Sequence, residues 1–267
     1  TPGTTPGTIP GTTPGTTPGT TPGTTPGTTP GTTPGTTPGA ISVTIPVTPS
    51  TPGRPVTPLK PSETKLNMAD HYAYMVGYPD GTFRADRQMT RAEVTMMFAR
   101  LLKDRPNGTP FMENRYRDVQ ETNWFSYAVD YMSEQNIIKG YPDGTFRPNN
   151  QITRAEFAVI VSKFFEVKTT EMSFKDVPAN HWAKQYIDSL VANNMMGGYP
   201  DGTFKPEQAI TRAEVVTVIN KAINRTPDKA EIDANANNAK RYKDLNKNHW
   251  AYYDVIEAST DHTVHAK

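Results

Sequence analysis

The chain has 267 residues, a formal net charge of +1 and no cysteine. The balanced charge gives no general attraction to nucleic acid or to an anionic membrane. The lack of cysteine excludes disulfides and thiolate chemistry. No run of 18 apolar residues occurs, so we expect no membrane-spanning helix. The chain starts at Thr1 without methionine or a signal peptide, and we expect it to be a processed piece of a longer protein.

Residues 1–61 are predicted to be a disordered Thr/Pro/Gly-rich linker. Residues 1–39 repeat the unit Thr-Pro-Gly-Thr, and the period of four excludes collagen, which needs glycine at every third position. Such a segment has almost no apolar surface, so burial cannot offset the conformational entropy that the chain would lose on folding. The rest of the chain carries all 3 Trp, 12 Tyr and 10 Phe, which is enough for a folded core.

A two-part motif then occurs three times. Gly-Tyr-Pro-Asp-Gly-Thr-Phe is followed at a fixed distance by Thr-Arg-Ala-Glu, with the first parts at 77–83, 140–146 and 198–204 and the second parts at 90–93, 153–156 and 211–214. Pro-Asp-Gly is typical of a tight turn, and Thr-x-x-Glu predicts a capping box at a helix start. The apolar spacing that follows predicts an amphipathic helix in each copy, as in Val94, Met97, Phe98 and Leu101.

A second block contains an aromatic residue, an Asp two positions later and a Trp six positions after that, and it also occurs three times. It begins at Tyr116, Phe174 and Tyr242 and contains Trp124, Trp182 and Trp250. A residue suited to an N-cap lies two positions before each Trp, so each Trp is predicted to open a second helix; these residues are Thr122, Asn180 and Asn248.

The first copy lacks its own Trp block, because Pro61 stands where the Trp would fall. Residues 62–76 are compatible with a helix in its place. The last block has no turn after it, so we expect it to close against the first copy in a pseudo-threefold ring. The predicted units are a first repeat with a degenerate first half, two full repeats and a closing half-repeat, at 62–109, 110–168, 169–230 and 231–267.

These motifs resemble the S-layer homology domain over about residues 62–260, and the adjacent linker is similar to that of cell-surface anchoring proteins of cellulosome-producing Gram-positive bacteria. The resemblance implies an all-α, three-pronged arrangement around a central three-helix bundle. It further implies non-covalent binding of a secondary cell-wall polysaccharide that carries pyruvylated amino sugars, at the cell wall or S-layer. A missing N-terminal module would dock another protein.

Cationic side chains are the first candidates for binding an acidic sugar. The arginine of each Thr-Arg-Ala-Glu stands at the first helical position, where the helix dipole disfavours a cation; these are Arg91, Arg154 and Arg212. A guanidinium beside a helix N-terminus can bind a carboxylate. A second cation follows each motif Phe, namely Arg84, Arg147 and Lys205. The alternative is that the arginines stack on a neighbouring unit or pair with an acid.

The three tryptophans are the second candidates, since indole faces suit the apolar faces of sugars; the alternative is that they belong to the core. The resemblance implies that each helix-start Arg borders a groove with the next Trp, pairing Arg91 with Trp124, Arg154 with Trp182 and Arg212 with Trp250.

The turn residues are weaker candidates. Asp80, Asp143 and Asp201 are expected to form the turns, with binding of sugar hydroxyls as the alternative. Gly77, Gly140 and Gly198 are expected to permit a close backbone approach, and Asp118, Asp176 and Asp244 to be structural. The Asp-Gly turns lack the alternating ligands and final Glu of an EF-hand.

Nothing in the sequence indicates an enzyme, a metal site or a cofactor. The five His have no metal-ligand spacing, and no nucleophile-elbow, Walker or dinucleotide-binding motif occurs. Catalytic sites are usually single, whereas each notable residue here occurs three times. We therefore expect a non-enzymatic anchor. A self-associating module of a surface lattice and a glycan hydrolase fragment are the alternatives.

Overall fold

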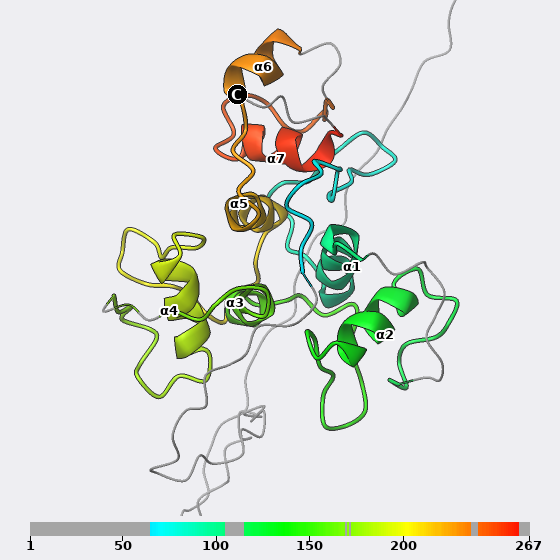
Figure 1. The fold of residues 1–267 in the computed structure, drawn as a ribbon, viewed down its shortest axis with the longest axis vertical. Helices are drawn as coiled ribbons and strands as arrows, with labels where there is room; N and C mark the ends of the chain where they lie inside the picture. The colour runs from blue at the N-terminus through cyan, green and yellow to red at the C-terminus, as the bar shows by residue number, and fades with distance from the viewer. Residues whose placement is uncertain (1–64, 105–114, 169, 171, 236–239, 262–267) are drawn as a thin grey trace, which may run out of the picture. The chain divides into compact units, whose positions relative to one another are not determined.

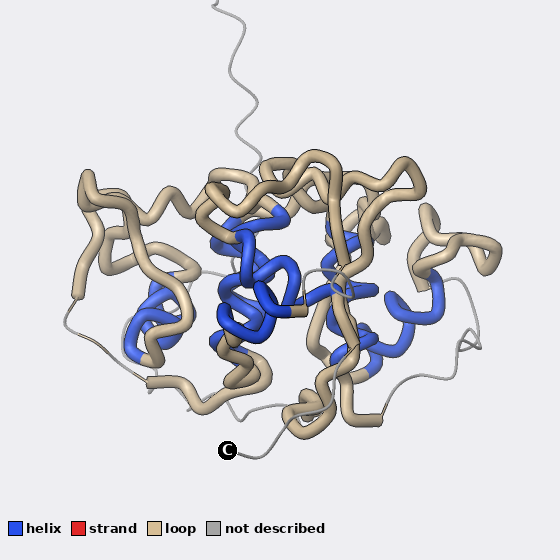
Figure 2. The backbone as a smooth tube through the Cα atoms, turned by 90° about the horizontal axis from the view of Figure 1, so that it is seen from above, coloured by secondary structure: helices blue, strands red, loops and turns tan. Residues whose placement is uncertain are grey.

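The computed structural model describes residues 65–104, 115–168, 170, 172–235 and 240–261, all within one compact unit, Thr48–Lys267. The predicted linker, residues 1–61, lies outside these ranges. The described residues form a mainly helical structure with seven α-helices and no β-strand, as predicted (Figures 1 and 2). None of these helices is long and apolar enough to cross a bilayer.

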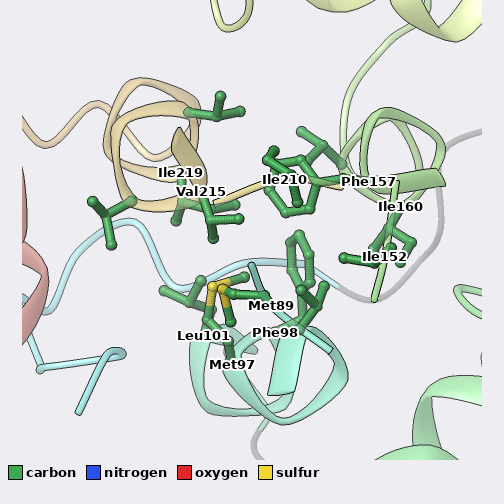
Figure 3. Packing of buried hydrophobic residues seen from close by; sticks show 14 of the residues in the cluster. Met89, Met97, Phe98, Leu101, Ile152, Phe157, Ile160, Ile210, Val215 and Ile219 are labelled. Carbon is green, nitrogen blue, oxygen red and sulfur yellow. The ribbon is translucent and has the colours of Figure 1, made fainter. Parts of the chain in front are cut away.

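Three central helices follow the three Thr-Arg-Ala-Glu motifs: α1 (Arg91–Leu101), α3 (Arg154–Ser162) and α5 (Arg212–Ala222). The predicted capping box is present in all three: the Thr hydroxyl accepts from the Glu amide, and the Glu carboxylate accepts from the Thr amide. The three helices lie side by side at the centre of Figure 1. Figure 3 shows their apolar side chains converging, including Phe98 and Phe157, whose ring centroids are 6.0 Å apart.

Backbone hydrogen bonds join the three copies in a closed cycle. The Met89 amide donates to the Ile210 carbonyl, Ile210 donates to Ile152, and Ile152 donates to Met89, each at 3.0 Å. A second cycle uses the first amide of each central helix, with Arg91 donating to Asn150, Arg154 to Gln208 and Arg212 to Arg87, each at 2.9 Å. The third copy therefore contacts the first as the first contacts the second, which is the predicted pseudo-threefold arrangement.

An outer helix packs on each central helix: α2 (Ser126–Glu134) on α1, α4 (Lys184–Ala192) on α3, and α7 (Tyr252–Ser259) on α5 (Figure 1). The predicted helix starts at Thr122, Asn180 and Asn248 are wrong. Each outer helix begins two residues after the Trp, with an N-cap residue that makes no side-chain cap bond. The tryptophans instead lie in turns ahead of the helices, because local bonds such as that from the Ala183 amide to His181 Nδ1, 3.1 Å, set a turn first.

The C-terminal block closes the ring by supplying what the first copy lacks. The two carboxylate oxygens of Asp244 accept from the amides of Phe83 and Arg84, each at 2.7 Å. The Tyr242 ring packs on Phe83 with centroids 5.1 Å apart. The within-copy equivalents are the same, with Asp118 accepting from the amides of residues 146 and 147, and Asp176 from those of residues 204 and 205. The C-terminal block therefore contacts the first turn as the two earlier blocks contact theirs, and all three aspartates hold backbone amides.

A helix was considered for residues 62–76 as a replacement for the missing Trp block. The described part of this segment, residues 65–76, contains no helix. The amides of Tyr74 and Met75 both donate to the Ala258 carbonyl at the end of α7, 3.0 Å each. Because α7 already occupies the outer-helix position beside α5, this segment runs along it in an irregular conformation.

One short helix, α6 (Lys229–Ala234), was not predicted. Its signal is Asp228, whose side chain accepts from the Glu231 amide at 3.0 Å.

Candidate functional site

The helix-start arginines are buried and clamp the neighbouring copy. Arg91, Arg154 and Arg212 are only 9%, 4% and 5% exposed. In each, Nε donates to the carbonyl of a motif Phe and Nη2 donates to a second carbonyl ahead of the same turn, with distances between 2.7 and 3.0 Å. The guanidinium carbon also lies 4.8–5.2 Å from the centroid of the motif Tyr ring. Both alternatives to ligand binding are found: each arginine stacks on a neighbouring unit, and Arg154 also pairs with Glu214 at 2.8 Å.

The backbone amides at the helix N-termini are not open to an anion. The first amide of each central helix donates to the next copy in the cycle described above. The second does too, as in Ala92 to Pro148 at 3.0 Å. The Thr hydroxyl takes the third amide. The amides that would hold an anion are therefore already used within the protein.

The second set of cations lies at the surface of the same turns. Arg84, Arg147 and Lys205 all have φ of 57°, a left-handed conformation that is uncommon for residues with a side chain. This conformation folds each cation over the motif Tyr ring, at 4.1, 3.8 and 4.1 Å from the centroid. The same strained geometry in three copies holds a cation beside each tyrosine.

The turn aspartates have structural roles. Asp80 Oδ1 accepts from the amide and the hydroxyl of Thr82, at 2.9 and 2.6 Å, and Oδ2 pairs with Arg84 Nη2 at 2.9 Å. The bond from the Thr82 hydroxyl, followed by that from Arg84, lowers the pKa of Asp80 to about 2. Asp143 and Asp201 make the same two threonine bonds. Within the described ranges, no three His, Asp or Glu side chains gather as metal ligands.

The motif glycines are required by an aromatic ring of the protein itself. A Cβ on Gly77 would lie 2.3 Å from a ring carbon of Tyr242, and Gly140 and Gly198 face Tyr116 and Phe174 at 2.2 and 2.3 Å. The expected close approach is confirmed, and its partner is the aromatic residue of the Trp block.

The tryptophans are exposed, so the core alternative is wrong. Trp124, Trp182 and Trp250 are 57%, 37% and 61% exposed. Each ring is supported by its neighbour: Trp124 makes an edge contact with Phe125 at 5.2 Å, and the other two stack on His181 and His249 at 5.8 and 5.7 Å. Each of the three indole rings is thus exposed and packed against the ring of an adjacent residue.

A cavity of about 150 Å³ brings Trp124 together with Arg212. The lining comes from residues 74–78, from α1 and the residues before it, from the Trp124 turn and from α5. It consists of Tyr74, Met75, Val76, Tyr78, Met89, Glu93, Met96, Met97, Arg100, Trp124 and Arg212. Within this cavity the arginine beside Trp124 is Arg212 and not the expected Arg91. Arg91 extends into the second copy's loop, whereas Trp124 lies over α1.

By the pseudo-threefold register, the positions equivalent to Arg212, Tyr78 and Trp124 are Arg91, Tyr141 and Trp182 in one set and Arg154, Tyr199 and Trp250 in the other. The Trp124 cavity is called the first groove, and these two equivalent sets the second and third grooves. The motif tyrosines and the capping glutamates were missed as groove residues by sequence reasoning. Their signal was available, because both belong to the repeated motifs.

The capping glutamates face the arginines differently in the three grooves. Glu214 Oε1 lies 2.8 Å from Arg154 Nη1, and Glu156 Oε1 lies 3.5 Å from Arg91 Nη1. Glu93 instead pairs with Arg87, whose Nη1 lies 2.8 and 2.9 Å from its two oxygens.

Comparison with known proteins places these repeats in a family. The S-layer homology domain matches residues 67–95, 115–158 and 173–216. The chain is 39% identical over 207 residues to "Cell surface glycoprotein 1" of Acetivibrio thermocellus, covering 73% of this chain and 9% of that protein. It is 38% identical over 205 residues to the "Cellulosome-anchoring protein" of the same organism, covering 73% and 43%. It is 28% identical over 187 residues to its "Exoglucanase XynX", covering 62% and 17%.

The chain thus spans less than half the length of each of these relatives. The matched segments coincide with the three turn-and-helix copies and the two Trp blocks between them. Together they identify residues 67–216 as a triplet of S-layer homology domains.

Proposed function

We propose that this chain anchors a surface protein to the cell wall of a Gram-positive bacterium by binding a wall polysaccharide in the grooves between its repeats. The observation that carries the proposal is the set of three exposed, supported indole faces, of which Trp124 shares a cavity with the Arg212 cation. An indole face packs on the apolar face of a sugar, and a guanidinium pairs with a carboxylate.

The relatives support the same role, since one is a cellulosome-anchoring protein and another is a cell surface glycoprotein. In this proposal the finer ligand is a pyruvylated amino sugar, whose ketal supplies the carboxylate. Residues 1–61 serve as a spacer between the wall and a further module that docks another protein.

The proposed role is non-enzymatic. The repeated acids have structural partners: Glu93, Glu156 and Glu214 complete capping boxes. The turn aspartates hold threonines, as Asp80 does. The segment shared with the exoglucanase is 17% of that protein, which fits an attached anchoring module better than a hydrolytic domain.

The test is co-sedimentation of the full chain with purified wall sacculi, before and after mild acid removal of pyruvate ketals. Binding that is lost with the ketals is the expected result. Binding that is unchanged would contradict the pyruvylated ligand but keep wall anchoring. The alternative hypothesis is that the exposed tryptophans join copies of the chain in a surface lattice. It would be favoured if the chain did not bind the wall and assembled on its own in a concentration-dependent way.

A further inference from the structure

Two hydrogen-bond donors in the Trp124 cavity have no partner in the described part of the chain. The hydroxyl of Tyr78 is buried without a hydrogen-bond partner. Arg212 donates through Nε and Nη2 to the carbonyls of Phe83 and Val76, but its Nη1 donates to nothing among the described residues. Burial lowers the pKa of Arg212, so its charged form is poorly compensated there. Both residues line the cavity beside Trp124.

In the other two grooves, one carboxylate oxygen of the protein serves both equivalent donors. Glu214 Oε1 accepts from Tyr199 and from Arg154 Nη1, each at 2.8 Å. Glu156 Oε1 accepts from Tyr141 at 3.4 Å and lies 3.5 Å from Arg91 Nη1. The third groove is therefore tightly satisfied from within, and the second only loosely.

Arg87 causes the difference in the first groove. Its Nη1 bonds both oxygens of Glu93, and this bond raises the pKa of Arg87. Glu93 also accepts from the Thr90 amide at 2.8 Å as part of its capping box. The residues equivalent to Arg87 are Asn150 and Gln208, which carry no charge to hold a glutamate in this way.

We propose that the groove formed by Tyr78, Arg212 and Trp124 is the preferred subsite for a carboxylate-bearing sugar, and that Arg87 determines this preference. The proposal rests on the proposed function and ranks its three grooves. The sugar carboxylate accepts from Tyr78 and from Arg212 Nη1, as the Glu214 oxygen does from their equivalents in the third groove. The indole of Trp124 and the methionines of α1 contact the sugar's apolar face. Affinity falls in the order of the Trp124, Trp182 and Trp250 grooves, because a ligand must displace progressively better-bonded glutamates.

The chain contains only three tryptophans, so three indole N–H signals report on the three grooves separately. The experiment titrates the full ¹⁵N-labelled chain with methyl glycosides of a pyruvylated N-acetylhexosamine, of glucuronic acid and of a neutral N-acetylhexosamine. We expect the Trp124 signal to saturate at about tenfold lower concentration than the Trp250 signal, since a charge-assisted hydrogen bond is worth about that factor. Only the two carboxylated sugars should show this order. Comparing their affinities tells whether the groove prefers the carboxylate of a pyruvate ketal or that of a uronic acid.

Two exchange variants test Arg87 itself. Arg87→Asn frees Glu93 to satisfy Tyr78 and Arg212, so the Trp124 affinity should fall toward that of Trp182. Asn150→Arg, at an exposed position, should capture Glu156 and raise the Trp182 affinity. The control Arg117→Asn removes an exposed arginine outside the cavity lining and should leave the order unchanged.

Tyr78→Phe should weaken binding of the carboxylated sugar at Trp124, while the indole signals of the other two grooves titrate as before. The ranking of the grooves would be overturned if the Trp124 signal did not saturate first, or if Arg87→Asn left the Trp124 affinity unchanged. The proposed anchoring function would stand in either case, because the indole signals would still respond to sugar. If none of the three glycosides shifts any indole signal, both proposals are overturned.

Discussion

The helix-start arginines and the tryptophans recur equally faithfully, yet the fold treats them in opposite ways. Each arginine is at most 9% exposed and holds carbonyl oxygens of the neighbouring copy, whereas each tryptophan is at least 37% exposed. Repetition in the sequence therefore does not tell a structural residue from a ligand-binding one. Burial and hydrogen-bond partners separate the two: the arginines hold neighbouring copies together, and the tryptophans stay exposed, as the proposed binding of a wall sugar requires.

The largest expected effect comes from removing a clamp. Arg154→Ala deletes the bonds to the Phe204 and Gly197 carbonyls and leaves Glu214, whose side chain is 17% exposed, without its cation. We expect the free energy of unfolding to fall by about 3 kcal/mol, as for other buried pairs that lose one partner. Chemical denaturation measures this loss, with Arg117→Ala, at an exposed arginine, as the control. A loss no larger than that of the control would show that the clamp is not structural.

A smaller loss is expected from filling the space at a motif glycine. Gly140→Ala places a Cβ 2.2 Å from the Tyr116 ring and 2.6 Å from the Thr145 carbonyl oxygen, so the ring must move. Overpacking of this kind costs about 1–3 kcal/mol. The matched control is Gly197→Ala, where a Cβ meets nothing within 4 Å. Equal denaturation midpoints for the two variants would contradict the packing seen between the Trp block and the turn.

The turn aspartates should make stability depend on acid pH. Bonds from Thr145, first from its hydroxyl, lower the pKa of Asp143 from 3.8 to about 2. A lowered pKa in the folded state means that the contribution is present above the ordinary pKa and is lost as the pH falls toward 2. The difference in melting temperature between the wild type and Asp143→Asn should therefore narrow between pH 4 and pH 2. A difference that is constant across this window would show that Asp143 is not ionised in the turn.

The smallest effect on stability is expected at the tryptophans. Trp124→Ala removes a side chain that is 57% exposed, and the change in the free energy of unfolding should lie within about 0.5 kcal/mol, as at other surface positions. A loss comparable to that of Arg154→Ala would place Trp124 among the structural residues, together with the buried arginines.

The sequence predicted those parts of the fold that local chemistry determines. Turns, capping boxes and the need for the last block to pair with the first copy all follow from residues close together in the chain or from counting halves. The exposure of the tryptophans could not be predicted, because the turn that lifts Trp182 depends on a bond to a histidine ring. Neither could the meeting of Arg212 with Trp124, which depends on which side of α1 each neighbouring copy occupies.

The use of the helix N-terminal amides by neighbouring carbonyls was also hidden from the sequence, because those bonds join residues far apart in the chain, as from Arg91 to Asn150 and from Arg212 to Arg87. Since the arginine side chains also hold carbonyls of neighbouring copies, an arginine substitution would disturb the fold as well as the proposed binding. The tryptophans give the cleaner test.

That test is co-sedimentation of the full chain with wall sacculi for the wild type, the Trp124→Ala/Trp182→Ala/Trp250→Ala variant and the Arg117→Ala control, each shown to be folded by circular dichroism. The wild type and the control are predicted to sediment with the wall, and the folded triple variant to remain in solution. A folded triple variant that sediments as fully as the wild type would contradict the claim that the exposed tryptophans bind the wall polysaccharide.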